Sequence, residues 1–315
     1  ARPDERSHHH GFGSVGFFLA AVAHLDRPLP LGHPARLRPP CRWPSSLRLG
    51  ELGLARALIR KDGTKVDWAG ALRCEWCVGE EGARAALQRF VDETMRGYDG
   101  RERHRADQRR TSELSPHLRF GEVSSREILN VVLRATGARA SPTFLRKFAW
   151  RDLAYWSLWR FPNLADVSFR PQYEEQPWHG SRDDAEAWKT GRTGYPLVDA
   201  AMRQLWATGW LPNYMRHVVA SFLIEYLGCD WRVGERWFDY TLVDADPAIN
   251  AFMWQNGGHS GMDQWNFVMH PVFAAKSCDP DGSYVREWLP QFARLPVEYV
   301  HCPWEAPRTL LIARG

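Results

Sequence analysis

Residues 244–258 read DADPAINAFMWQNGG, a stretch that carries both the start and the end of a helix. Asp246 is one of the residue types that cap helix N-termini, and Pro247 suits the first helical position, where no backbone N–H is needed. The two closing glycines are typical of a helix end. Asp244 lies outside this helix and remains available to pair with an arginine. We predict a helix over 247–256 with carboxylates at its start.

The same signals recur along the chain from residue 76 onward. Apolar residues return at three- and four-residue spacing, and Gly, Pro or Asp separates one block from the next. Ser141 and Pro142 stand at the cap and first position of the block 143–160. Further blocks cover residues 183–190, 196–208, 213–227 and 231–243. Strand alternation is nearly absent, so we predict an all-α fold.

Residues 1–45 differ in composition and are rich in Pro, Arg, Gly and His. Prolines at this density exclude a long helix. The apolar run at 12–25 is too short to span a bilayer, so we expect no membrane association. We expect a disordered lead and linker remnant over 1–45, followed by a helical domain over 46–310.

Composition narrows the classes of function. The 315 residues carry a net charge of +4, which suits an acidic partner such as nucleic acid without requiring one. A chain with 16 tryptophans often lines an aromatic ligand site or stacks nucleobases, although packing between helices accounts for most of them. The six cysteines are scattered. They predict neither a disulfide framework nor a metal site, and they fit a reducing intracellular compartment: nucleus, cytoplasm or plastid.

Two segments have features that suit anions. Thr111-Ser-Glu-Leu-Ser115 opens a helix, where hydroxyls, backbone N–H groups and the positive end of the helix dipole converge in a way that suits a pyrophosphate. A plain capping sequence is the simpler interpretation. Residues 99–110 are rich in arginine and form either a solvated loop or a phosphate-facing surface.

Two helix faces combine cationic and aromatic side chains. Lys147, Trp150 and Arg151 share one face of the block 143–160, which suits an anionic or aromatic ligand or is simply solvated. Arg216 lies close to an apolar helix stripe and therefore needs a carboxylate partner.

Together, these segments resemble the photolyase/cryptochrome family of flavoproteins. The similarity runs over about 76–307, with a weaker tail back to Pro39. Many motifs in a fixed order carry it, unlike a single short pattern. They include TSELSPHLRFGEVS from Thr111, FAWRD from Phe148, WKTGRTGYPLVDAAMR from Trp188, DWRVGER from Asp230 and DPDGSYVREWLP from Asp279.

The resemblance implies a helical domain that holds FAD in a folded, U-shaped pose. It implies that Arg216 pairs with Asp244 and that Asn250 faces N5 of the flavin. The implied cofactor-binding residues are Tyr98, Thr111, Ser112, Glu113, Leu114, Ser115, Trp150, Arg151, Asn213, Arg216, Asp244, Ala245, Asp246 and Asn250.

The resemblance also implies a chain of oxidisable rings for electron transfer. Trp254 would lie nearest the flavin, Trp231 in the middle and Trp178 at the surface. Structural packing remains the alternative for each ring taken separately. Asn250 and His217 complete the implied catalytic set.

The positions at which the family contacts damaged DNA are altered here. Lys147 stands where dimer photolyases carry a glutamate, Tyr214 replaces an arginine, and Asn256 replaces a stacking tryptophan. Trp150 remains as one wall for a flipped base. The (6-4) photolyases use two histidines, of which His217 is present.

Three interpretations therefore stay open. The first is a light-driven DNA lyase that splits pyrimidine dimers, and the second is a blue-light receptor that signals to partner proteins. The third is a truncated product that does not hold FAD stably. The family's N-terminal α/β domain is expected to be largely missing, so the resemblance assigns no antenna chromophore.

Overall fold

Among the residues that the structure describes, the regular elements are helices and one small hairpin. In that hairpin, strand β1 (Leu58–Ile59) pairs antiparallel with strand β2 (Lys65–Val66). The all-α prediction is therefore confirmed, while the expected disordered lead lies almost entirely outside the described residues. The computed structural model describes residues 41–42, 45–53, 58–137, 141–260, 262 and 268–314.

The predicted helical blocks are present with small shifts at their ends. The short helical turns include η5 (Arg101–His104). They also include the π-helical turns η3 (Phe90–Thr94) and η8 (Phe222–Tyr226), which continue α3 and α9. The α-helices are α2 (Gly70–Glu75), α3 (Glu80–Arg89), α4 (Ser115–Arg119), α5 (Ser125–Thr136), α6 (Pro142–Arg160), α7 (Arg182–Lys189), α8 (Pro196–Thr208), α9 (Asn213–Ser221), α10 (Trp231–Thr241), α11 (Pro247–Gly257), α12 (Pro271–Cys278), α13 (Ser283–Trp288), α14 (Val297–Val300) and α15 (Arg308–Arg314).

Local capping explains where the two helices of the site begin. The Ser141 hydroxyl accepts a hydrogen bond from the Phe144 N–H at 3.1 Å, which starts α6. Asp246 accepts the N–H groups of Ala248 and Ile249 at 3.1 and 3.2 Å, which starts α11. Both predicted helix starts are confirmed.

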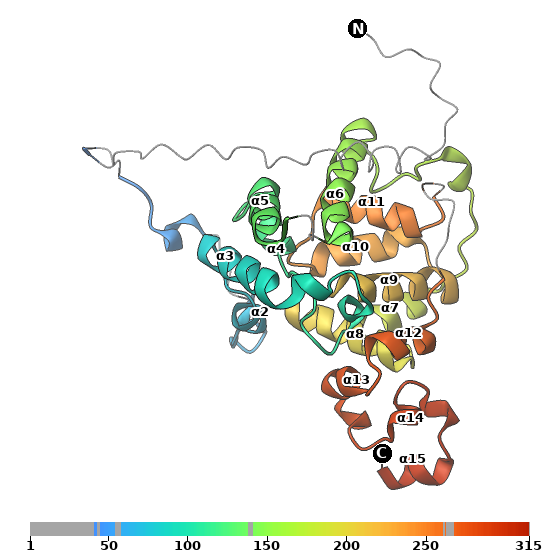
Figure 1. Ribbon diagram of the computed structural model, residues 1–315. Coiled ribbons are helices and arrows are strands. Elements are labelled where there is room, and N and C mark those ends of the chain that lie inside the picture. Colours follow the sequence, from blue (N-terminus) through green and yellow to red (C-terminus); the bar gives the residue numbers. More distant parts are fainter. Residues whose placement is uncertain are drawn as a thin grey trace.

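Three apolar clusters hold the helices together. The largest cluster includes residues of the consecutive helices from α7 through α13. The second joins α3, α5 and the first half of α6, and the third joins the second half of α6 to α11. Helix α11 packs against both α6 and α10, as Figure 1 shows. The polar N-terminus of α11 is therefore held between two helices. This places a buried polar site next to the apolar clusters.

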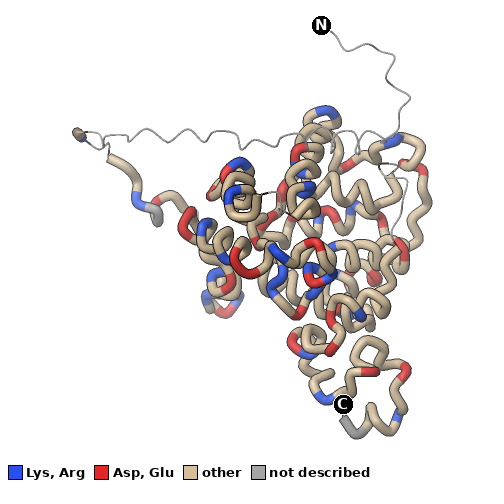
Figure 2. The backbone as a smooth tube through the Cα atoms, viewed as in Figure 1, with Lys and Arg blue, Asp and Glu red and all other residues tan. Residues whose placement is uncertain are grey.

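Charge is mixed over the described surface. Figure 2 shows Lys and Arg interspersed with Asp and Glu along most helices. Among the described residues, no helix is both long and apolar enough to cross a membrane.

Candidate functional site

A buried ion pair occupies the centre of the site. Arg216 of α9 donates from Nη2 to Oδ2 of Asp244 at 2.8 Å, and its Nε donates to the Leu211 carbonyl at 2.9 Å. The Asp244 side chain is 3% exposed, and that of Arg216 is 24% exposed. The carboxylate partner that Arg216 was predicted to need is therefore Asp244. The second oxygen of Asp244, Oδ1, is buried and has no hydrogen-bond partner in the described protein.

A second carboxylate ties α6 to the start of α11. Besides capping α11, Asp246 accepts a hydrogen bond from the Tyr155 hydroxyl at 2.6 Å. Arg151 places Nη1 3.4 Å from the same carboxylate and its guanidinium 5.1 Å above the Tyr155 ring. Arg119 of α4 donates to the carbonyl of Ala245, between the two aspartates. Four elements therefore converge on the segment from Asp244 to Asp246.

Asn250 has a partner that the sequence did not reveal. Its Nδ2 donates to the backbone carbonyl of Glu235 at 2.9 Å and to Oε1 of the same residue at 3.0 Å. Burial raises the pKa of Glu235 to about 6. The sequence signal for this residue is a glutamate on the inward face of an amphipathic helix, beside Gly234. Glu235 orients the Asn250 amide, so it belongs to the site.

The segment Thr111–Ser115 does not behave as the capping sequence that we considered the simpler interpretation. Helix α4 begins at Ser115, and the capping position is Leu114, whose side chain makes no cap hydrogen bond. Glu113 turns instead into a left-handed conformation at φ 53°. Its buried carboxylate lies 3.0 Å from Arg89 and 3.2 Å from Arg109. The pyrophosphate interpretation of this segment remains a prediction.

Tyr98 lies in an apolar cluster. Its ring meets those of Phe90 and Phe144 edge-on, with centroids 5.4 and 5.6 Å apart. Burial raises the pKa of the Tyr98 hydroxyl to about 12. The structure therefore gives Tyr98 a packing role in the second cluster, and its implied contact with the cofactor remains a prediction.

Among the altered lesion-contacting positions, Lys147 lies near other basic side chains. Burial, with the positive charges of Arg103 and Arg216, lowers the pKa of Lys147 to about 8. Burial, with the charges of Lys147 and Arg216, lowers the pKa of His217 to about 4. Tyr214 stacks on the His104 ring at 4.1 Å. The positive charges of Lys147, Arg103 and Arg216 repel further cations and favour an anion or a hydrogen-bond acceptor.

The other residues predicted to contact DNA or the cofactor lie in different surroundings. Trp150 packs against Phe252 with ring centroids 5.8 Å apart, so part of the predicted stacking wall is used inside the third cluster. Asn256 is half-buried, and Asn213 at the start of α9 is exposed.

The arginines of the segment 99–110 are mostly paired within the protein. Arg105 bonds to Asp107, and Arg109 bonds to Glu75 and Glu113. Arg103 donates to three backbone carbonyls, those of Tyr98, Asp99 and Gly100. The segment is therefore neither a purely solvated loop nor a fully available phosphate-binding surface.

The three tryptophans of the predicted relay differ in burial. The side chains of Trp231 and Trp254 are 1% and 3% exposed, whereas Trp178 is half-buried. A Cβ atom built on Gly258 would lie 2.5 Å from the Trp254 carbonyl oxygen and 2.6 Å from Cγ of Trp231. Gly258 therefore packs against the Trp231 side chain and the backbone of Trp254, and the third tryptophan lies closer to solvent.

The Trp254 ring is held by close packing. It stands edge-on to Phe238 at 5.0 Å and to Trp188 at 6.4 Å. A Cβ atom on Gly234 would lie 2.1 Å from Cη2 of Trp254, closer than any tolerated contact. Only glycine at 234 permits this position of the ring.

We expect Gly234→Ala to lower the free energy of unfolding by about 1–3 kcal/mol, because the new methyl group overpacks the core against Trp254. Chemical denaturation measures this change. Gly257→Ala is the matched control, since a Cβ there meets nothing within 4 Å. Equal stability of the two variants would contradict the packing that we describe.

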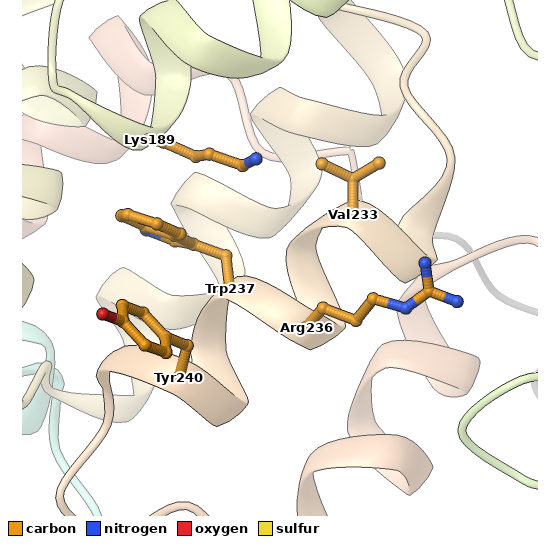
Figure 3. A pocket seen from close by; sticks show the side chains of 5 residues that line it. All are labelled: Lys189, Val233, Arg236, Trp237 and Tyr240. Atoms are coloured by element: carbon orange, nitrogen blue, oxygen red, sulfur yellow. The ribbon is translucent and has the colours of Figure 1, made fainter.

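Other aromatic side chains lie on the outer side of α10. Trp237 stacks on Trp206 at 5.8 Å, and the Lys189 ammonium lies 5.5 Å from the Trp237 ring. With Val233, Arg236 and Tyr240, Lys189 and Trp237 line an open hollow, shown in Figure 3. These rings show that much of the tryptophan content serves packing and the surface.

All six cysteines are free thiols. Among the described residues, no group of three or more His, Cys, Asp or Glu side chains is arranged to hold a metal ion.

Comparison with known proteins identifies the family. The family described as the FAD binding domain of DNA photolyase matches residues 144–313, more than half of the chain. The chain therefore belongs to the photolyase/cryptochrome family, and FAD is the cofactor of its helical domain.

Relatives of both functional classes are similar to this chain. A deoxyribodipyrimidine photo-lyase of Agrobacterium fabrum is 38% identical over 304 residues, which cover 95% of this chain and 62% of the relative. Cryptochrome-1 of Arabidopsis thaliana is 35% identical over 274 residues, covering 83% of this chain and 40% of the relative. The crystal structure of a class III photolyase from Agrobacterium tumefaciens superposes with a TM-score of 0.82 at 37% identity and covers 95% of this chain and 61% of that one. The chain spans less than two thirds of each.

The residues present fit FAD. The buried Asp244 Oδ1 lacks a hydrogen-bond donor, and buried polar atoms are almost always satisfied. The flavin ring carries an imide N–H that can act as such a donor. Arg151 lies on the same segment through its pair with Asp246. Asp244 and Arg216 would hold the ring, with Asn250 nearby on α11.

Proposed function

We propose that this protein performs light-driven electron transfer to FAD through Trp254, Trp231 and Trp178. The observation that supports the proposal is the difference in burial, with two enclosed tryptophans, Trp231 and Trp254, on the packed helices α10 and α11, and a third that approaches solvent. Bound FAD supplies a chromophore whose excited state accepts one electron. The protein supplies the rings, excludes water around the inner two, and places a carboxylate–guanidinium pair beside the cofactor cavity.

Between the two uses of this chemistry, we propose blue-light reception, with dimer repair as the alternative. Lys147, Tyr214 and Asn256 support the first, because they replace the acid, the arginine and one stacking ring of the dimer photolyases. Asn250 supports the second, because plant cryptochromes carry an aspartate there. The similarity to a class III photolyase also supports repair. Signalling proteins are the expected partners of a receptor, and DNA is the expected partner of a lyase.

The proposal predicts that the purified protein is yellow and holds about one non-covalent FAD per chain. Under blue light with an external thiol, the flavin absorption should bleach as FAD is reduced. Absorbance spectroscopy and quantification of released FAD measure both. A folded protein that contains no flavin and takes none up would contradict the proposal. It would favour the interpretation as a truncated product that does not hold FAD stably.

We further expect weak, salt-sensitive binding of DNA with little preference for a pyrimidine dimer. Loss of one stacking ring costs about 1–3 kcal/mol, comparable with the few kcal/mol needed to flip out a damaged base. Each neutralised phosphate lowers log K by about 0.9 per log unit of salt. Titration of damaged and undamaged oligonucleotides at two salt concentrations tests this. A preference of about 100-fold, or about 2.7 kcal/mol, with light-dependent loss of the dimer would establish repair instead.

The same binding should depend on pH through Lys147. Because the Lys147 pKa is lowered to about 8, its positive charge is present at lower pH and is lost as the pH rises through that value. Binding should therefore weaken between about pH 7 and about pH 9, where other lysines keep their charge. Lys147→Met should remove most of this dependence. An unchanged pH profile in that variant would exclude Lys147 from the DNA surface.

A further inference from the structure

His259 lies beside the outer tryptophan of the proposed relay. Its ring stands edge-on to that of Trp178, with centroids 6.5 Å apart and an interplanar angle of 69°. His259 directly follows Gly258, which packs against the Trp231 side chain. The imidazole beside the outer ring is therefore one residue away from a contact with the middle tryptophan.

The imidazole is bonded to a carboxylate. Nε2 of His259 lies 2.8 Å from Oε1 of Glu225, on the π-helical turn η8. An ionised carboxylate only accepts hydrogen bonds, so Nε2 is the donor. Both side chains are mostly shielded, at 26% and 21% exposure, which strengthens their electrostatic effect on a neighbouring ring.

The backbone at His259 is unusual. His259 has φ 54°, and Glu113 is the other non-glycine residue with positive φ among the described positions. Left-handed backbone costs a non-glycine residue about 1–2 kcal/mol, and glycine avoids that cost. The imidazole is therefore held in a backbone conformation that locally favours glycine.

The middle tryptophan has the opposite kind of neighbour. The Arg232 guanidinium lies 4.8 Å from the Trp231 ring. Glu174 and Asp230 bind the edge of that guanidinium at 2.6 and 3.0 Å, but the group in contact with the ring is the cation. The Trp231 ring therefore contacts a guanidinium whose charge two carboxylates offset, whereas the Trp178 ring contacts a carboxylate-bonded imidazole.

We propose that the His259–Glu225 pair stabilises oxidised Trp178 and so prolongs the charge separation that light creates. The inference rests on the proposed function. In the proposed relay, Trp254 would supply one electron to the bound cofactor, Trp231 would then give one electron to Trp254, and Trp178 would give one to Trp231. No bond forms or breaks, and the single positive charge ends on Trp178. The negative charge of Glu225, held close through His259, lowers the energy of that state.

Transient absorption of the FAD-loaded protein after a laser flash tests the proposal. Glu225→Gln keeps the shape of the side chain but removes its charge, and we expect charge recombination to accelerate on the order of 3–10-fold. His259→Gly should have a similar effect while the fold is retained, because glycine is unstrained at this backbone angle. Glu225→Asp keeps the charge and should restore much of the lifetime. Glu80→Gln removes an equal, exposed charge on α3 and should change nothing.

The outcomes separate this inference from the proposed function. Trp178→Phe should leave the positive charge on Trp231, closer to the cofactor, and so shorten the lifetime of the tryptophan radical. If no tryptophan radical forms, or if Trp178→Phe leaves its lifetime unaltered, the proposed relay is wrong. If Trp178→Phe shortens the lifetime but Glu225→Gln and His259→Gly recombine at the unaltered rate, the relay stands and the role of the His259–Glu225 pair is overturned.

Discussion

Trp254→Phe should slow flavin photoreduction by about 100-fold, equivalent to about 2.7 kcal/mol on the barrier. Phenylalanine preserves an aromatic ring in the same buried position but is far harder to oxidise. The electron would then have to come directly from Trp231, over a longer path. The rate of flavin bleaching under constant blue light with an external thiol measures the effect. Trp231→Phe should be the next most affected variant.

Trp188→Phe is the matched control for this experiment. Trp188 is also a buried tryptophan, stands 6.4 Å from Trp254 and donates from its indole to the Val219 carbonyl at 2.9 Å. Its replacement should disturb packing to a similar degree but leave most of the photoreduction rate. If Trp254→Phe and Trp231→Phe both reduce flavin at the unaltered rate, Trp254 and Trp231 act in packing only and the relay is wrong.

Arg216→Met should lower the free energy of unfolding by about 3–5 kcal/mol and release FAD, because it leaves the Asp244 carboxylate buried without its partner. Asp244 already has one buried oxygen that no group in the described part of the chain satisfies. Chemical denaturation and the FAD content after gel filtration measure the two effects. The expected change is a large part of the total stability of a typical domain.

The double variant Arg216→Met/Asp244→Asn should recover part of the lost stability, since it removes the unpaired charge. Arg84→Ala is the control. Arg84 pairs with Glu80 at 2.8 Å, but both side chains are mostly exposed, so that pair contributes less than about 1 kcal/mol. A loss for Arg216→Met as small as that for Arg84→Ala would show that the Asp244 pair is not desolvated.

The sequence by itself determined the helical class, the starts of α6 and α11, and the candidate set of cofactor residues. Helix starts are readable because they depend on neighbours within three residues, as the bonds of Ser141 to Phe144 and of Asp246 to Ile249 show. The requirement of Arg216 for a carboxylate was also readable, because an arginine beside an apolar stripe cannot remain unpaired. The ordered motifs then named the family, which the comparisons show.

Tertiary structure alone decided which distant side chains meet. The bond of Asn250 to Glu235, the close contact of Trp254 with Gly234 and the pairing of His259 with Glu225 each join separate elements. Tertiary structure also turned Glu113 away from capping and paired most arginines of 99–110 within the protein. Local sequence sets the conformation of a helix, but its rotation and position against its neighbours follow from the packing of all the apolar faces together. Contacts between helices therefore become definite only when the whole core is assembled.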